Sequence, residues 1–347
     1  MTERKTAVVM NASSRRPLPV PRNEAEEPEE KKDTMSFTTK MKTIAAAALS
    51  VAVLLPLAAC GTTDDSASTG ASGSDTATIT SYDVSGVKKD EEIAKLLPES
   101  VTKDGKLTIG TNPSYAPAEF LDADGKTQIG YDMDLARALG NVFGLKTEIV
   151  SSNFDTIIPA IGSKYDLGIA AFTITPDRMK SVDFVSYFTA GMGYAVKKGN
   201  PNKVNENDLC GLKVAVETGT VEETAINETA KKCKADGKKD IEIQSSKQQT
   251  DATTAVVTGK ADVFFADSPV VGYAIAQTDG QLEQLGKDFD SVPNAIAIKK
   301  GDAGTVEAVQ KGMQKLMDDG TYDKILKHWG VESGALKTAE VNPDVEG

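Results

Sequence analysis

One pattern of residues occurs twice in this chain and restricts its fold more than any other feature. The segments 155–166 (DTIIPAIGSKYD) and 251–262 (DATTAVVTGKAD) both read as a helix followed by Lys, one further residue and Asp. An apolar run follows each segment at once, Leu167–Ala171 in the first case and Val263–Ala266 in the second. Such runs are typical of strands buried on both faces of a sheet. The repeat favours two α/β lobes of similar build over the alternative of a chance likeness.

The segment before the first copy supports the same fold class. Leu107–Ile109 reads as a strand, 132–143 as an amphipathic helix and Thr147–Val150 as another strand. This β-α-β order predicts a parallel sheet covered by helices. A chain of 347 residues is long enough for two such domains with a cleft between them.

Charge and histidine content exclude several classes of function. The chain has 39 Lys and Arg against 51 Asp and Glu, a net charge of −12, which is unsuited to nucleic acid as a partner. Its one histidine, His328, leaves too little for a Ser-His-Asp triad or a multi-histidine metal site, and we interpret it as structural. We therefore expect no metal, no cofactor and no enzymatic activity.

The first 60 residues read as an export signal. Lys40 and Lys42 precede an apolar run, Thr43–Ala59, that is short and rich in alanine for a membrane span. The run ends in Leu57-Ala58-Ala59-Cys60, which resembles the lipobox of bacterial lipoproteins, where the cysteine thiol is acylated. The alternative is a buried helix that ends in a core cysteine. A lipid-anchored Cys60 would hold the protein at the outer face of the cytoplasmic membrane.

The residues on either side of this signal differ in composition. Residues 1–34 are polar and acidic, unlike the start of a signal peptide, so we expect them to be untranslated or disordered, with translation from Met35 or Met41. The predicted signal peptide then covers 35–59. Residues 60–81 are rich in Ser, Thr, Gly and Asp, which predicts a flexible tether.

Two further cysteines, Cys210 and Cys233, lie in the exported part. Thiols oxidise outside the cytoplasm, and these two have one possible intramolecular pairing. A disulfide between them would stabilise the fold by roughly 3 kcal/mol. Two unpaired structural cysteines are the alternative.

Polar residues follow the predicted strands, where ligands bind in open α/β sheets. These positions are 112–120, 171–178, 218–221 and 267–268. A guanidinium binds a carboxylate through two parallel hydrogen bonds, which makes Arg178 the candidate for an anionic group. The alternative for Arg178 is a surface pair with Asp177 or Asp183. An acid directly after an apolar strand, Asp267, needs a cation such as an α-ammonium group.

Aromatic residues and a glycine complete these loops. Tyr115 and Phe154 follow strand ends, where their faces can pack on a ligand, although both also suit a core. Gly219 before Thr220 lets the backbone approach a ligand closely.

Several motifs together resemble one known family. They are Ile109-Gly110-Thr111, Ser114-Tyr115-Ala116-Pro117, Glu119-Phe120, Gly130-Tyr131-Asp132-Met133-Asp134-Leu135-Ala136, Phe154-Asp155, Ile158-Pro159-Ala160, Thr173-Ile174-Thr175-Pro176-Asp177-Arg178 and Val182-Asp183-Phe184. The closing Asp319-Gly320-Thr321-Tyr322 and Trp329-Gly330 fit as well. From about Lys106 to Gly330 the chain resembles the polar amino-acid-binding proteins of ABC importers, family 3.

This resemblance implies a type II periplasmic-binding-protein fold, in which two α/β lobes are joined by a two-strand hinge. We expect the hinge near Gly191–Ala195 and Pro293–Ile296. The implied organisation is an N-terminal extension at 82–103, lobe 1 at 104–192 and 297–333, lobe 2 at 193–296, and a tail at 334–347.

The resemblance also implies a role for each candidate residue. Arg178 and Thr173, with Thr220, would hold the α-carboxylate of an amino acid. Asp267, with the Ala171 carbonyl, would take the α-ammonium group. Tyr115 and Phe154 would pack on the ligand side chain. The expected partners are the permease and ATPase of an ABC importer, which take the solute after the lobes close.

Three positions depart from the family pattern: Asn112, where several members carry an acid, Ala118 and Val221. The missing acid disfavours a basic ligand, although Glu119 and Glu217 can supply negative charge, so the side chain that is selected stays open. Two other functions share this fold. One is a sensory module that reports its ligand to a receptor, and the other is a dehydratase-like enzyme.

Overall fold

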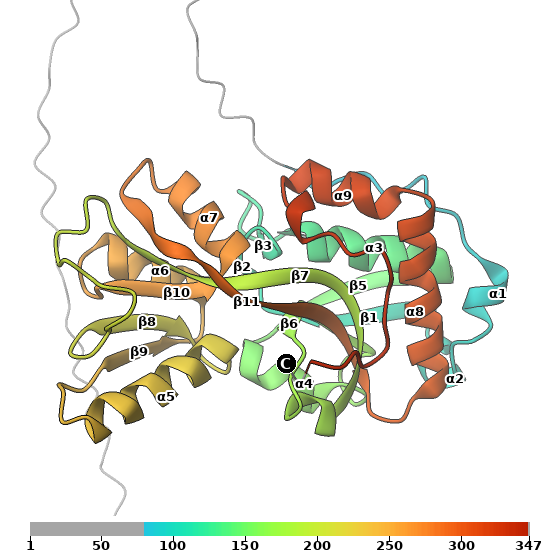
Figure 1. Ribbon diagram of the computed structural model, residues 1–347. Helices are drawn as coiled ribbons and strands as arrows, with labels where there is room; N and C mark the ends of the chain where they lie inside the picture. Colours follow the sequence, from blue (N-terminus) through green and yellow to red (C-terminus); the bar gives the residue numbers. More distant parts are fainter. Residues whose placement is uncertain (1–79, 346–347) are drawn as a thin grey trace, which may run out of the picture. The chain divides into compact units, whose positions relative to one another are not determined.

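Two long antiparallel strands, β7 (Val182–Lys197) and β11 (Leu282–Lys299), run through the middle of an eight-stranded sheet. The computed structural model describes residues 80–345. In Figure 1 both strands extend from the part that carries β1, β5 and β6, here called lobe 1, to the part that carries β8, β9 and β10, here called lobe 2. The strand order is β5-β1-β6-β11-β7-β10-β8-β9, so β7 and β11 belong to both lobes.

Lobe 1 is built on parallel strands. β1 (Lys106–Thr111) lies between β5 (Lys146–Ser151) and β6 (Leu167–Thr173) and is parallel to both. Alternate residues of β6 face opposite cores, with Leu167 and Ile169 in one hydrophobic cluster and Ala170 and Phe172 in another. β6 is thus buried on both faces, as its apolar sequence predicts.

Helices cover both faces of this half of the sheet. The remaining elements of lobe 1 are α1 (Glu91–Ala94), α2 (Glu99–Thr102), α3 (Tyr131–Phe143), α4 (Phe154–Ala160), η1 (Arg178–Lys180), α8 (Ala303–Asp318), α9 (Thr321–Trp329), η2 (Glu332–Gly334) and the small sheet of β2 (Ser114–Tyr115), β3 (Glu119–Leu121) and β4 (Gln128–Ile129). α3 ends at Gly144, whose left-handed φ of 69° is strained for other residues and stops the helix.

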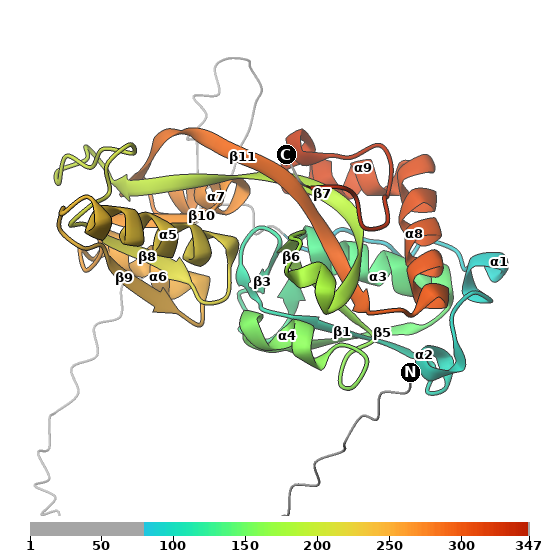
Figure 2. The same cartoon turned by 60° about the horizontal axis from the view of Figure 1, so that its bottom comes forward.

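Lobe 2 repeats this build at smaller size. β8 (Lys213–Glu217) lies between β9 (Glu242–Ser246) and β10 (Val263–Asp267) and is parallel to both. Its helices are α5 (Val221–Ala235), α6 (Gln249–Val257) and α7 (Ser268–Gln277). Figure 2 shows these elements gathered at one end of β7 and β11, with the lobe 1 elements at the other.

The duplicated sequence pattern corresponds to equivalent structure in the two lobes. α4 leads into β6, and α6 leads into β10. Both helices are shorter than the sequence predicts, because α4 ends at Ala160 directly after Pro159 and a glycine turn at Gly259 follows α6. The two-lobed α/β fold expected from the sequence is confirmed.

The pairing of β7 with β11 is irregular near the predicted hinge. Register shifts separate three pairs, in which Leu285, Phe289 and Val292 lie opposite Tyr194, Met192 and Ala190 on β7. The irregular stretch of β11 therefore lies just before the predicted segment 293–296, where a further register shift follows Asn294. The hinge position and the exact lobe boundaries stay predictions.

Both ends of the described chain pack on lobe 1. The backbone N–H of Tyr82 donates to Asp134 on α3, and Val84 and Ile93 lie in the core. In the predicted tail, Val341 pairs with Val185 on the edge of β7. Residues 334–345 therefore form part of the lobe. None of the helices within 80–345 is long and apolar enough to cross a membrane.

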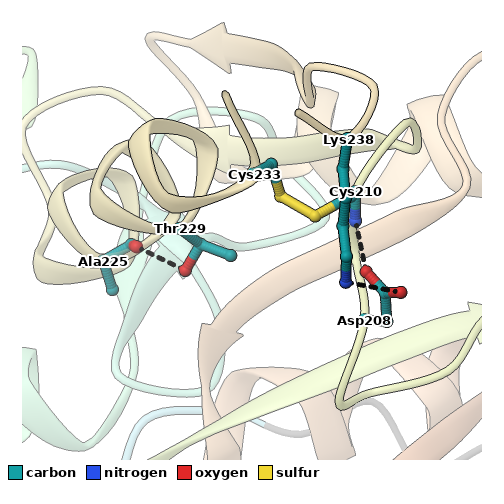
Figure 3. Close-up of a disulfide and its surroundings, with 6 residues drawn as sticks. All are labelled: Asp208, Cys210, Ala225, Thr229, Cys233 and Lys238. Carbon is teal, nitrogen blue, oxygen red and sulfur yellow. Dashed lines mark hydrogen bonds and ion pairs between the residues drawn. A yellow bond between two sulfur atoms is a disulfide. The ribbon is translucent and has the colours of Figure 1, made fainter. Parts of the chain in front are cut away.

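Cys210 and Cys233 form a disulfide, as one of the two sequence alternatives predicts. It ties the segment before β8 to the last turns of α5, and Figure 3 shows Asp208 beside it, bonded to Lys238. Because α5 begins beside the candidate site, the disulfide braces this helix at its far end.

Reduction of the disulfide should destabilise the protein without unfolding it. The bond closes a sequence separation of 23 residues. By restricting the unfolded chain, a loop of this size adds about 3 kcal/mol to the free energy of unfolding. Urea denaturation with and without a reductant measures this difference, and a Cys210→Ser/Cys233→Ser variant should match the reduced protein. An unchanged denaturation midpoint on reduction would contradict it.

Candidate ligand-binding site

The carboxyl ends of β1, β6, β8 and β10 carry polar residues that are buried between the lobes. Nine of the ten ligand-site residues that the sequence predicts are at most 9% exposed, namely Asn112, Tyr115, Glu119, Phe154, Ala171, Thr173, Glu217, Thr220 and Asp267. The tenth, Arg178, is partly buried. Buried polar groups need hydrogen-bond or charge partners. The partners of these residues show how the site is assembled.

Arg178 bridges the two lobes. Its Nη1 donates to the Thr173 carbonyl at 2.7 Å, and its Nη2 donates to the Gly219 carbonyl of lobe 2 at 3.1 Å. The guanidinium carbon also lies 5.3 Å from the centroid of the Phe154 ring, within range of a cation–π contact. These contacts fix the plane of the guanidinium. Burial lowers the pKa of Arg178, and the Glu222 and Asp267 carboxylates oppose that shift.

The alternative that Arg178 is a surface residue paired with Asp177 or Asp183 is wrong. Asp177 pairs with Lys180 at 3.0 Å. Asp183 accepts hydrogen bonds from Lys300, from the Gly301 backbone and from Asn342. Arg178 is therefore left to the region between the lobes.

Asp267 ends β10 on the opposite lobe. Its backbone N–H donates to the Tyr115 hydroxyl of lobe 1 at 3.0 Å, so Tyr115 fixes where Asp267 lies. The Asp267 carboxyl lies beside the carboxyl of Glu222 on α5. Burial raises the pKa of Asp267 well above its usual range, and the charge of Glu222 raises it further. Burial also raises the pKa of Glu222.

Asn112 connects the end of β1 to lobe 2. Its Nδ2 donates to Glu217 Oε1 at 2.6 Å and to the Lys247 carbonyl at 3.1 Å. The Ser114 hydroxyl donates to Asn112 Oδ1 and accepts from the Gln249 backbone N–H, each at 3.0 Å. Asn112 and Glu217, predicted separately, are therefore in contact.

Ala171 is held in an uncommon conformation at the end of β6. Its φ is 45°, in the left-handed region that alanine rarely adopts. Its N–H donates to Asp132 Oδ2 at 2.8 Å, and its carbonyl accepts from Asn294 on β11 at 2.9 Å. The Tyr187 hydroxyl donates to the other oxygen of Asp132. These bonds hold the carbonyl that the sequence assigned to the ammonium group.

Glu119 lies behind Ala171. It is fully buried, and neither oxygen of its carboxyl has a hydrogen-bond partner within the described part of the chain. The carboxyl of Asp132 lies close to it. Burial raises the pKa of Glu119 well above its usual range and raises that of Asp132 to about 6. Glu119 therefore lies next to Asp132, the residue that binds the Ala171 N–H.

Thr220 is the N-cap of α5. Its hydroxyl donates to the Glu217 carbonyl at 2.8 Å and accepts from the Glu223 N–H at 3.1 Å. Glu223 in turn accepts from the Gly219 N–H at 2.7 Å. This cap fixes the start of α5, where the helix dipole favours an anion.

Sequence reasoning missed Glu222, Gln249 and Asn294, which are each at most 2% exposed in this region. Glu222 sits in the first turn of α5, where acids are ordinarily solvated, so its sequence carries no signal of burial. Gln249 begins α6 and Asn294 lies within β11. Neither belongs to the loops that follow the predicted strands. Among residues 80–345, no group of three or more His, Cys, Asp or Glu is arranged to hold a metal ion.

Two α/β lobes joined by two long paired strands, with a partly buried guanidinium and a buried acid where the lobes meet, define a clamp-type solute-binding protein. A sequence model of the bacterial extracellular solute-binding proteins, family 3, matches residues 107–332. The chain belongs to this family, as its motifs indicate.

Named relatives agree with this assignment. The chain is 34% identical to the arginine-binding protein ArgT of Corynebacterium glutamicum, over 72% of this chain and 83% of that protein. It is 29% identical to the ABC transporter glutamine-binding protein GlnH of Bacillus subtilis, over 85% of this chain and 99% of that protein.

Solved structures are similar as well. An ancestral arginine-binding protein bound to arginine has a TM-score of 0.61 and 34% identity, covering 65% of this chain and 98% of its own. The ancestral amino acid-binding protein AncCDT-1, a precursor of cyclohexadienyl dehydratase, has a TM-score of 0.60 and 37% identity, covering 68% and 99%. These likenesses support the type II fold.

The buried carboxyls should make the protein less stable as pH rises. Glu119, Asp132, Glu217 and Asp267 have raised pKa values in the folded state, so each contributes stability below its unfolded pKa of about 4 that is lost as pH rises through its folded pKa. For Asp132 this loss begins at about pH 4 and is nearly complete just above its folded pKa of about 6.

Urea denaturation without ligand at pH 5, 6, 7 and 8 tests this dependence. The free energy of unfolding should fall over this range, and the fall should be smaller in Glu119→Gln. A free energy of unfolding that rises from pH 5 to 8 would contradict the assignment.

Proposed function

We propose that this chain captures one free amino acid between its lobes and delivers it to the permease and ATPase of an ABC importer. Arg178 binds the α-carboxylate, and Asp267 binds the α-ammonium group. One observation carries the proposal: the two opposite charges come from different lobes, and each is tied to the other lobe, Arg178 through Gly219 and Asp267 through Tyr115. Both ends of a zwitterion are matched only when the lobes are together.

The remaining candidate groups fit around these two. The Thr173 and Ala171 positions lie at the end of β6, beside Arg178, and the start of α5 at Thr220 favours the carboxylate. Lobe closure about β7 and β11 removes water from both charged ends, so each needs its partner. Tyr115 and Phe154 supply aromatic surface for the rest of the ligand.

The relatives' names support recognition through the α-groups. They specify arginine, glutamine and histidine, which differ in their side chains and share only the α-carboxylate and α-ammonium. A site that reads those shared groups with Arg178 and Asp267 accounts for a common fold with different ligands.

Binding without chemical conversion is part of the proposal. The named relatives are binding proteins, although AncCDT-1 is described as the precursor of a dehydratase. Acids near the ligand have the raised pKa values that general acids also need, so catalysis requires a direct check. Prolonged incubation with the bound amino acid should return it unchanged by mass spectrometry, whereas a dehydrated or deaminated product would contradict the proposal.

Removal of either charge should abolish tight binding. Arg178→Ala leaves the α-carboxylate buried without a counter-charge, which costs about 3 to 5 kcal/mol, or at least about a hundredfold in affinity. Asp267→Asn should weaken binding through the α-ammonium group in the same way. Isothermal calorimetry with the amino acid that gives the largest thermal shift measures both.

Arg137→Ala is the matched control, because Arg137 pairs with Asp134 and donates to the Gln128 carbonyl, both in lobe 1. It should leave the affinity within about threefold of the wild type. If Arg178→Ala binds as tightly as this control, the assigned site is wrong.

We also place the protein at the outer face of the cytoplasmic membrane, held by an acylated Cys60. The support is the apolar run 43–59 and the lipobox that ends in Cys60. Both lie outside the described residues, as do the predicted segments 1–34 and 35–59 and nearly all of 60–81. Diacylated cysteine binds membranes stably, as a single chain does not.

A Cys60→Ser variant should therefore lose its anchor. Expressed in its native host, the wild type should sediment with membranes and the variant should not. Equal membrane fractions for the two proteins would rule out the lipid anchor. Retention of residues 1–34 in the cellular protein, seen by peptide mass spectrometry, would rule out a start at Met35 or Met41.

A further inference from the structure

The region between the lobes holds more negative charge than an amino-acid backbone requires. Arg178 is its one guanidinium among the described residues, and Glu217, Glu222 and Asp267 contribute three carboxyls, each at most 6% exposed. In the proposed function Arg178 and Asp267 are used by the α-groups of the ligand. Glu217 and Glu222 are then left over.

Glu222 has an unused oxygen. The residue is 2% exposed, and its Oε1 has no hydrogen-bond partner anywhere in 80–345. An unpaired carboxylate oxygen in such a place costs free energy comparable to a lost hydrogen bond. Asp267, Arg178 and Thr220 all influence the Glu222 carboxyl, so Glu222 belongs to the candidate site.

Glu222 is not required to cap α5. The Thr220 hydroxyl accepts the Glu223 N–H, and the Glu223 carboxylate accepts the Gly219 N–H. Thr220 and Glu223 therefore cap the start of α5 without Glu222. The charged neighbours of Glu222 are instead those of the site, the Arg178 guanidinium and the Asp267 carboxyl.

A second acid and further acceptors lie close by. Glu217 is held by Asn112 at 2.6 Å, and Asn112 is linked through Ser114 to the backbone of Gln249. Both side-chain polar atoms of Gln249 are buried and lack partners within the described part of the chain. The sequence disfavoured a basic ligand because Asn112 replaces an acid, and the structure provides carboxyls beside it from lobe 2.

We propose that Glu222, assisted by Glu217, binds the positively charged side chain of the ligand, so that this protein selects amino acids with a guanidinium or a second ammonium group. This inference rests on the proposed function. A cation beside Glu222 would supply donors to the free oxygen and balance the charge left over by the α-groups. A neutral side chain would force Glu222 to stay protonated or unpaired.

Calorimetry with L-arginine, L-lysine and L-glutamine tests the inference. The wild type should bind arginine or lysine at least about a hundredfold more tightly than glutamine. Glu222→Gln should bind the preferred basic amino acid at least about tenfold more weakly and glutamine within about threefold of wild type, because it removes one charge-assisted hydrogen bond. Glu217→Gln should shift the preference in the same direction.

Glu228→Gln on α5 is the control, since Glu228 is an exposed acid paired with Lys231. It should leave all three affinities unchanged. The inference is overturned if the wild type binds glutamine as tightly as the basic amino acids, or if Glu222→Gln keeps the wild-type preference. Tight binding of a neutral amino acid would leave the proposed function standing, whereas binding of no amino acid would overturn both.

Discussion

A charge buried between two lobes needs a counter-charge, and the architecture of this protein follows from that requirement. Arg178 lies on one lobe and is partly buried, and Asp267 lies on the other and is buried. Within one rigid lobe such groups could pair with each other permanently and bind nothing. In the proposed function, their placement on separate lobes makes them complementary to a solute that carries both charges at a fixed distance.

The sheet supplies that placement. β6 and β10 are buried on both faces, so their carboxyl ends are rigid, and Ala171 and Asp267 are fixed where those strands stop. β7 and β11 carry both lobes, and their pairing loses regular register near Phe289 and Val292. Rigid strand ends joined through irregular strands are what the predicted hinge requires, since each half of the site would then keep its geometry as the lobes close.

Much of the fold could be predicted from the sequence because its strands and helices are specified by local patterns of apolar and polar residues. The buried strands and the helices before them could be predicted from apolar runs. The candidate site residues Arg178, Asp267 and Asn112 could be predicted because they come after strands. Glu222 could not be found this way, because a first-turn acid on a helix is normally solvated and its burial depends on the other lobe. Glu119 was predicted as a charge near the ligand, and the structure buries it beside Asp132, a neighbour that the sequence does not indicate.

The most direct test of the account is a thermodynamic cycle between Arg178 and the α-carboxylate of the ligand. The affinities of wild type and Arg178→Ala are measured by calorimetry for the bound amino acid and for its α-carboxamide, which lacks the negative charge. The account predicts that wild type loses at least about a hundredfold on amidation while Arg178→Ala distinguishes the two ligands by less than about threefold. Equal discrimination by both proteins would mean that Arg178 does not bind the carboxylate.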